Sequence, residues 1–103
     1  MARQITSNAV EAFLNGRNFK QSNTEVQAFD CGLITMTLHG HTIATKSTSG
    51  TIMISTCGWE TTTTKERLNG IMDALGLSRI FTKNHVIHLF DRPWDSAFLT
   101  AIN

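Results

Sequence analysis

Residues 58–70 hold side chains of the types that bind anions and aromatic groups. The segment contains Trp59, four consecutive threonines at 61–64, Lys65 and Arg67. An indole can stack on a nucleobase, while hydroxyls, cations and the free N–H groups at a helix start can bind phosphate. The sequence therefore predicts a candidate binding surface that consists of Trp59, Thr61, Thr62, Thr64, Lys65 and Arg67.

The same segment also fits a purely structural role. If Thr63 is the N-cap of a helix, Glu66 three residues later completes a capping box, and an apolar residue such as Trp59 often packs back on the helix start. We favour this structural interpretation of Trp59 over the binding one. The helix would begin at Thr64, end at Gly76 and present one apolar stripe to a core. That stripe consists of Leu68, Ile71, Met72 and Leu75.

Catalytic and metal-binding arrangements are incomplete in the sequence. A cysteine nucleophile needs a base and an orienting group, and the sequence places neither beside Cys57. His39 and His41 flank Gly40, so on a strand both imidazoles would share a face and could chelate a metal ion. At the corner of a hairpin they would diverge, which is the interpretation we favour. We therefore expect no enzymatic activity, no cofactor and no metal ion.

Composition narrows the class of protein. A chain of 103 residues is long enough for one compact domain, spanning 1–103. With 41% hydrophobic and 17% charged residues the chain is not a charge-driven disordered one, and no apolar run is long enough to span a membrane. A net charge of +1 gives no global attraction to nucleic acid. Cys31 and Cys57 lie in apolar, strand-like contexts, where we expect buried, reduced thiols.

Hydrophobic periodicity predicts a single small α+β domain, in which helices pack on an antiparallel sheet. A first helix is expected over 8–15, with Asn8 as its N-cap. The period then changes to two, which predicts strands between 25 and 58, and a second pair of strands follows at 78–83 and 85–90. With a short C-terminal apolar segment, the order is α-β-β-β-α-β-β. The predicted core comprises Val10, Phe13, Leu14, Val26, Leu33, Ile34 or Met36, Ile43, Ile52, Ile54, the helical stripe, Ile80 and Val86.

Three parts of the sequence together resemble a protein family. Residues 38–44 are Leu-His-Gly-His-Thr-Ile-Ala, residues 54–59 are Ile-Ser-Thr-Cys-Gly-Trp, and residues 63–69 are Thr-Thr-Lys-Glu-Arg-Leu-Asn. They are similar to a family of small proteins of tailed bacteriophages, in which Leu-His-Gly-x-x-Ile-Ala precedes Gly-Trp-x-Thr-x-Thr-Thr-Lys-x-Arg-Leu-Asn. The similarity spans roughly residues 12–90. It implies a phage origin and expression in a bacterial cytoplasm, and it implies no activity.

Two hypotheses of function follow. The first is a phage-encoded effector that binds a host or phage protein in the host bacterial cytoplasm, through exposed aromatic residues such as Trp94 and through the sheet face. The second is a nucleic-acid-binding accessory protein that uses the surface of residues 59–67 at the helix N-terminus. We expect no membrane partner, and the oligomeric state stays open.

Overall fold

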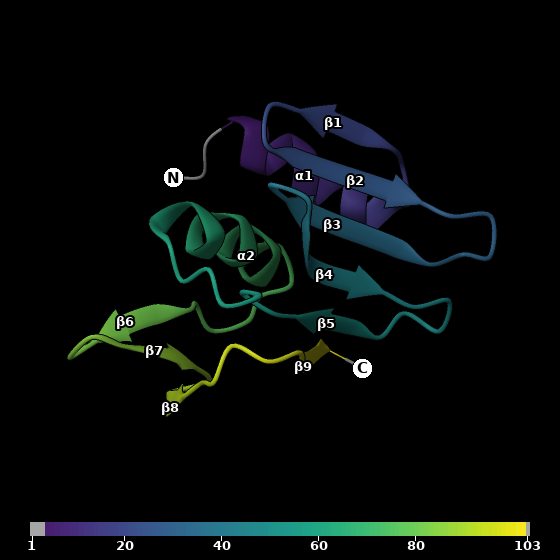
Figure 1. Ribbon diagram of the computed structural model, residues 1–103. Coiled ribbons are helices and arrows are strands. Elements are labelled where there is room, and N and C mark those ends of the chain that lie inside the picture. Colours follow the sequence, from purple (N-terminus) through teal and green to yellow (C-terminus); the bar gives the residue numbers. More distant parts are fainter. Residues whose placement is uncertain (1–3, 103) are drawn as a thin grey trace.

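The computed structural model describes residues 4–102, which form two helices and nine strands (Figure 1). In chain order these are α1 (Gln4–Asn15), β1 (Phe19–Gln21), β2 (Thr24–Ala28), β3 (Ile34–Leu38), β4 (His41–Lys46), β5 (Ile52–Ile54), α2 (Thr62–Ala74), β6 (Phe81–Lys83), β7 (Val86–Leu89), β8 (Arg92–Pro93) and β9 (Leu99–Ile102). Every described strand pairing is antiparallel. The predicted α+β class with an antiparallel sheet is confirmed.

The strands form two sheets. The larger has the order β1-β2-β3-β4-β5-β9, and the smaller has the order β6-β7-β8. Figure 1 shows α1, in purple, behind the large sheet, where it contacts β1, β2 and β3, while α2 contacts α1 and β4. The core lies between these helices and the sheet. Of the helices within residues 4–102, neither has the length and apolarity that crossing a membrane requires.

The structure adds four strands to the predicted order, namely β1, a fourth strand among β2–β5, the two-residue β8, and β9. The polar segment before Thr24 contains β1, which is too short for its period to be recognised and which pairs with β2 through a turn at Ser22 (φ 52°). The C-terminal apolar segment forms β9, which returns to pair with β5. The large sheet therefore joins residues from both ends of the described chain.

The first helix is longer than predicted. Asn8 is not its N-cap, because α1 is already helical at Gln4. Thr6, a polar residue ahead of the predicted start, is fully buried on the side that meets α2. The predicted end is confirmed, since Gly16 has a φ of 69° and Arg17 N donates to Ala12 O at 2.9 Å.

The second helix has a different N-cap from the predicted one. Thr61, with extended backbone angles, accepts a hydrogen bond from Thr64 N through its Oγ1 at 3.2 Å, so the helix begins at Thr62. Thr63 is therefore not the cap. Glu66, expected to complete a capping box, instead accepts hydrogen bonds from Thr6 and Arg67.

Thr61→Ala should lower the free energy of unfolding by ~1 kcal/mol, because it removes the acceptor for the Thr64 N–H. The matched control is Thr63→Ala, which leaves that cap intact and should change stability by less than about 0.5 kcal/mol. Urea denaturation of both variants measures the difference. Equal losses would mean that Thr61 does not cap the helix.

The two helices approach closely at Gly70. A Cβ at this position would lie 2.6 Å from Thr6 Cγ2 and 3.0 Å from Val10 Cγ2, so a larger residue would push α1 away. An interior glycine costs helix stability relative to alanine. Its presence here is explained by the packing of one helix on the other.

The predicted core is largely confirmed, with one change of face in β7. Leu68, Ile71 and Met72 are fully buried. Val86, however, is 43% exposed, and its neighbour Ile87 is buried in its place. Both faces of this strand carry apolar residues, so period-two alternation could not decide which one faces inward.

The expectation of two buried thiols is wrong for Cys31. This residue is exposed in the connection between β2 and β3. Cys57 is partly buried, and its Sγ donates to Thr42 O.

Candidate functional site

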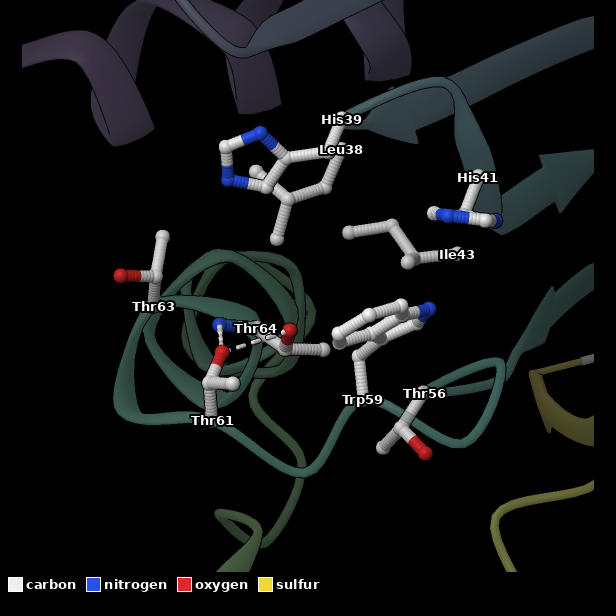
Figure 2. A pocket seen from close by; sticks show the side chains of 9 residues that line it. All are labelled: Leu38, His39, His41, Ile43, Thr56, Trp59, Thr61, Thr63 and Thr64. Atoms are coloured by element: carbon white, nitrogen blue, oxygen red, sulfur yellow. Dashed lines mark hydrogen bonds between the residues drawn. The ribbon is translucent and has the colours of Figure 1, made fainter.

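A surface hollow of about 380 Å³ lies between the β3–β4 hairpin and the start of α2 (Figure 2). We call it the Trp59 hollow; its lining residues are Leu38, His39, His41, Ile43, Thr56, Trp59, Thr61, Thr63 and Thr64. Its size falls within the range of ligand pockets, which starts at about 300 Å³. None of these lining residues is a lysine, arginine, aspartate or glutamate.

The first wall comes from the hairpin between β3 and β4. His39 (φ 51°) and Gly40 (φ 81°) are its two turn residues, and Leu38 pairs with His41 across it. Two positive φ values are the signature of the tight turn that matches the twist of a hairpin. Figure 2 shows the two imidazoles on different sides of the hollow, as expected for a hairpin corner. Within residues 4–102, no three His, Cys, Asp or Glu side chains are grouped to hold a metal ion.

A second turn places Trp59 beside this hairpin. Cys57 (φ 54°) and Gly58 (φ 81°) are its central residues, and Trp59 N donates to Thr56 O at 2.9 Å. The turn lies next to β4 because Ser55 N, just before it, donates to Ile43 O at 2.8 Å. These backbone hydrogen bonds therefore place Trp59 beside the β3–β4 hairpin.

The Trp59 side chain lies at the rim of the hollow. Its ring is 5.5 Å from that of His41, centroid to centroid, at an interplanar angle of 35°. It is 56% exposed, which for so large an apolar side chain is unusual. The interpretation of Trp59 as a buried core residue is therefore wrong, although the ring lines the hollow together with residues of the helix start.

The threonine run is divided between two sides of α2. Thr61 and Thr64 line the hollow, with the Thr64 side chain fully buried at its base. Thr62 is exposed and, together with Lys65, lines a separate hollow on the other side. Lys65 Nζ donates to Thr82 Oγ1 at 2.8 Å. Lys65 and Thr62 are therefore not part of the Trp59 hollow.

Arg67 is not the surface cation that we expected. Only 2% of it is exposed, because it shares the buried face of α2 with Thr64, Leu68 and Ile71, at i, i+3, i+4 and i+7. Its Nε donates to Thr24 Oγ1 at 3.0 Å, and its Nη1 donates to Thr6 Oγ1 at 2.6 Å.

The same Nη1 also donates to the Glu66 carboxylate, which accepts from Thr6 Oγ1 as well. These four residues, Thr6, Thr24, Glu66 and Arg67, form the Arg67 cluster, which joins α1, β2 and α2. The guanidinium is thus a structural link, and it does not face a ligand at the surface.

Trp94 is likewise not an exposed aromatic residue. It is 8% exposed, its Nε1 donates to Ala97 O at 3.0 Å, and its backbone N donates to Ile87 O at 3.0 Å. The indole belongs to the core, since the segment after β8 folds it inward. Trp94 is therefore too buried to be the exposed aromatic residue that was predicted for a protein-binding surface.

Sequence reasoning missed six residues of the hollow. Two of them, Leu38 and Ile43, were seen only as strand residues, and Thr63 was taken for a cap. His39 and His41 did give a signal, because the His-Gly-His turn stood out in the sequence. Thr56 gave no such signal in the sequence. In the structure its buried Oγ1 makes no hydrogen bond to any described residue.

Fold and site together define a small antiparallel α+β protein with a hollow between a hairpin and a helix start, which no Lys, Arg, Asp or Glu lines. Neither a curated protein nor a solved structure matches the sequence. A protein-family model does match: the chain belongs to the Kyanoviridae Gp96 protein family, over residues 2–100. It is therefore a phage protein, as the sequence resemblance implied.

Proposed function

We propose that this phage protein acts without catalysis, by binding another protein of the host or the phage in the host cytoplasm. The Trp59 hollow is the contact site. One observation carries the proposal: Trp59 is half-exposed, with its ring near that of His41, at the rim of a hollow that no Lys, Arg, Asp or Glu lines. Tryptophan is among the residues most enriched where protein contacts draw their binding energy.

The lining of the hollow suits an apolar side chain of a partner. Leu38 and Ile43, both almost fully buried, form an apolar floor, and the half-exposed Trp59 ring offers most of the carbon surface that a partner could cover. Burial of such surface stabilises a complex by about 25 cal/mol per Å². The hydroxyls of Thr61 and Thr63 provide the polar rim that such contacts have.

A protein partner fits the charges better than a nucleic acid does. Nucleic-acid affinity rests on cations that neutralise phosphates. Arg67 is buried in its cluster, Lys65 bonds to Thr82 outside the hollow, and the net charge is only +1. The surface predicted for nucleic acid thus keeps few of the cations on which that hypothesis depended.

The experiment compares two matched aromatic variants. Trp59→Ala removes the ring at the hollow, and Phe81→Ala removes a second exposed ring, which stacks on His88 at 5.0 Å but lies outside the hollow. A partner is first captured with the tagged wild-type protein from infected cells and then purified. Calorimetry should show about 30-fold weaker binding for Trp59→Ala and unchanged binding for Phe81→Ala, since a hot-spot residue contributes at least about 2 kcal/mol.

Equal affinities of the two variants would overturn the assignment of the hollow. The nucleic-acid hypothesis is tested on the same proteins, by titration with DNA and RNA at low salt. Binding that weakens with salt and depends on Trp59 would replace the protein partner by a nucleic acid.

A further inference from the structure

Strand β9 (Leu99–Ile102) is an open edge of the large sheet. It pairs with β5 on one side, and in the described part of the chain no strand pairs with its other side. An open edge presents unpaired N–H and C=O groups to any further strand.

This edge is apolar, and it carries neither a charge nor a proline. Phe98, Leu99 and Ile102 are 44%, 42% and 38% exposed, and residues 96–102 contain neither a charged residue nor a proline. Natural sheets commonly place charges or prolines on their edges to prevent pairing with another chain. The opposite edge strand, β1, carries such a charge, because Lys20 is exposed there.

Leu99 and Ile102 lie on the same face of the sheet. Leu99 pairs with Ile54 and Ile102 pairs with Ile52, both buried residues of β5. A register shift between Ile52 and Met53 is what brings two residues three positions apart to one face. The two side chains therefore extend the apolar face of the sheet beyond β5, where they are partly exposed.

We propose that β9 is a dimerisation strand, which pairs antiparallel with β9 of a second copy around a two-fold axis. Leu99 of each copy then lies beside Ile102 of the other. The sequence Leu-Thr-Ala-Ile is complementary to itself in this register, because the same apolar pair forms twice. Such self-complementarity is what a two-fold contact between identical chains requires.

A hollow beside the edge adds to the contact. It has a volume of about 660 Å³ and is lined by Leu89, Phe90, Arg92, Pro93, Trp94, Asp95 and Leu99. Ile102 of the second copy, placed beside Leu99, would lie at its mouth. This interface shares no residue with the lining of the Trp59 hollow.

The size of the contact sets its strength. Stable complexes bury about 800 Å² on each partner, and a four-residue edge with three large apolar side chains covers less. The dimer is therefore reversible, and its population rises with protein concentration.

Sedimentation equilibrium on the purified protein, from about 1 µM to about 1 mM, tests the proposal. The wild-type mass should rise from that of a monomer towards twice that value. Leu99→Lys and Ile102→Glu should each weaken the dimer at least about tenfold, because each places two charges against apolar neighbours. Phe29→Lys, at an exposed site away from β9, is the matched control and should dimerise like the wild type.

The decisive sample is an equimolar mixture of Leu99→Lys with Ile102→Glu. A mixed dimer contains one Lys–Glu pair and one native Ile–Leu pair, so the mixture should regain the dimer that each variant alone has lost. A wild-type protein that stays monomeric throughout the range would overturn the proposal, whatever the variants do. Single variants that dimerise like the wild type would place the contact elsewhere, and a monomeric mixture would exclude this register.

Discussion

Arg67→Ala should destabilise the protein by about 3–5 kcal/mol, the cost of leaving a buried pair with one partner. The substitution removes the donors to Thr6 and Thr24, and it breaks the ion pair between Arg67 and the Glu66 carboxylate, most of which is buried. It also removes the hydrogen bonds by which this side chain links α2 to α1 and to β2. Urea denaturation measures the loss as a lower midpoint with an unchanged slope.

Arg79→Ala is the matched control for this prediction. Arg79 and Asp73 also form an ion pair, with Nε 3.3 Å from Oδ1, but both side chains are more than half exposed. Exposed pairs of this kind contribute about 0–1 kcal/mol. If the two arginine variants lost similar stability, the Arg67 cluster would not be the link that its burial indicates.

Ile87→Ala should lower the free energy of unfolding by about 2–5 kcal/mol, the range for a buried aliphatic side chain. Ile87 is 3% exposed in the core, whereas Val86, the adjacent residue, points to the opposite face. Val86→Ala should therefore change stability by less than about 1 kcal/mol. A thermal melt of the two variants, recorded together, checks which face of β7 is inside.

The reverse order of the two effects would contradict the structure. A larger loss for Val86→Ala would mean that β7 presents the face first predicted from the sequence. Because the two residues are neighbours on one strand, any general weakening of the β6–β7 hairpin affects both variants alike.

Elements with a strong local pattern were predictable from the sequence. The stripe from Leu68 to Met72 repeats at helical spacing, and Gly16 and Gly76 marked the ends of both helices. The His39-Gly40 turn was marked by its glycine between two strand-like segments. In each case the residues that decide the structure lie within a few positions of one another.

The role of Arg67 was not predictable by the same reasoning. Its partners Thr24 and Thr6 are 43 and 61 positions away, so no local pattern contains them. Arginine is also rarely buried, which made a surface position the natural expectation.

Only the part of the candidate site that comes from one continuous segment was predictable from the sequence. Trp59, Thr61 and Thr64 were named from one continuous segment, and the structure brings them together. The hairpin wall joins them only through the pairing of residues 41–46 with the segment after residue 51, and a single sequence does not specify that register. Trp94 was predicted to be an exposed binding residue, but it is buried. Its position depends on the pairing of the β6–β8 sheet, which its local sequence does not show.

The two tryptophans of this chain lie in opposite surroundings, and this gives the protein a built-in pair of optical probes. More than half of Trp59 is exposed, Trp94 belongs to the core, and the chain has no tyrosine. Indole fluorescence shifts to shorter wavelength in apolar surroundings, so the two rings emit at different ends of the band. If the Trp59 emission moves to shorter wavelength, the hollow has been filled. If the Trp94 emission moves to longer wavelength, the core has opened to solvent.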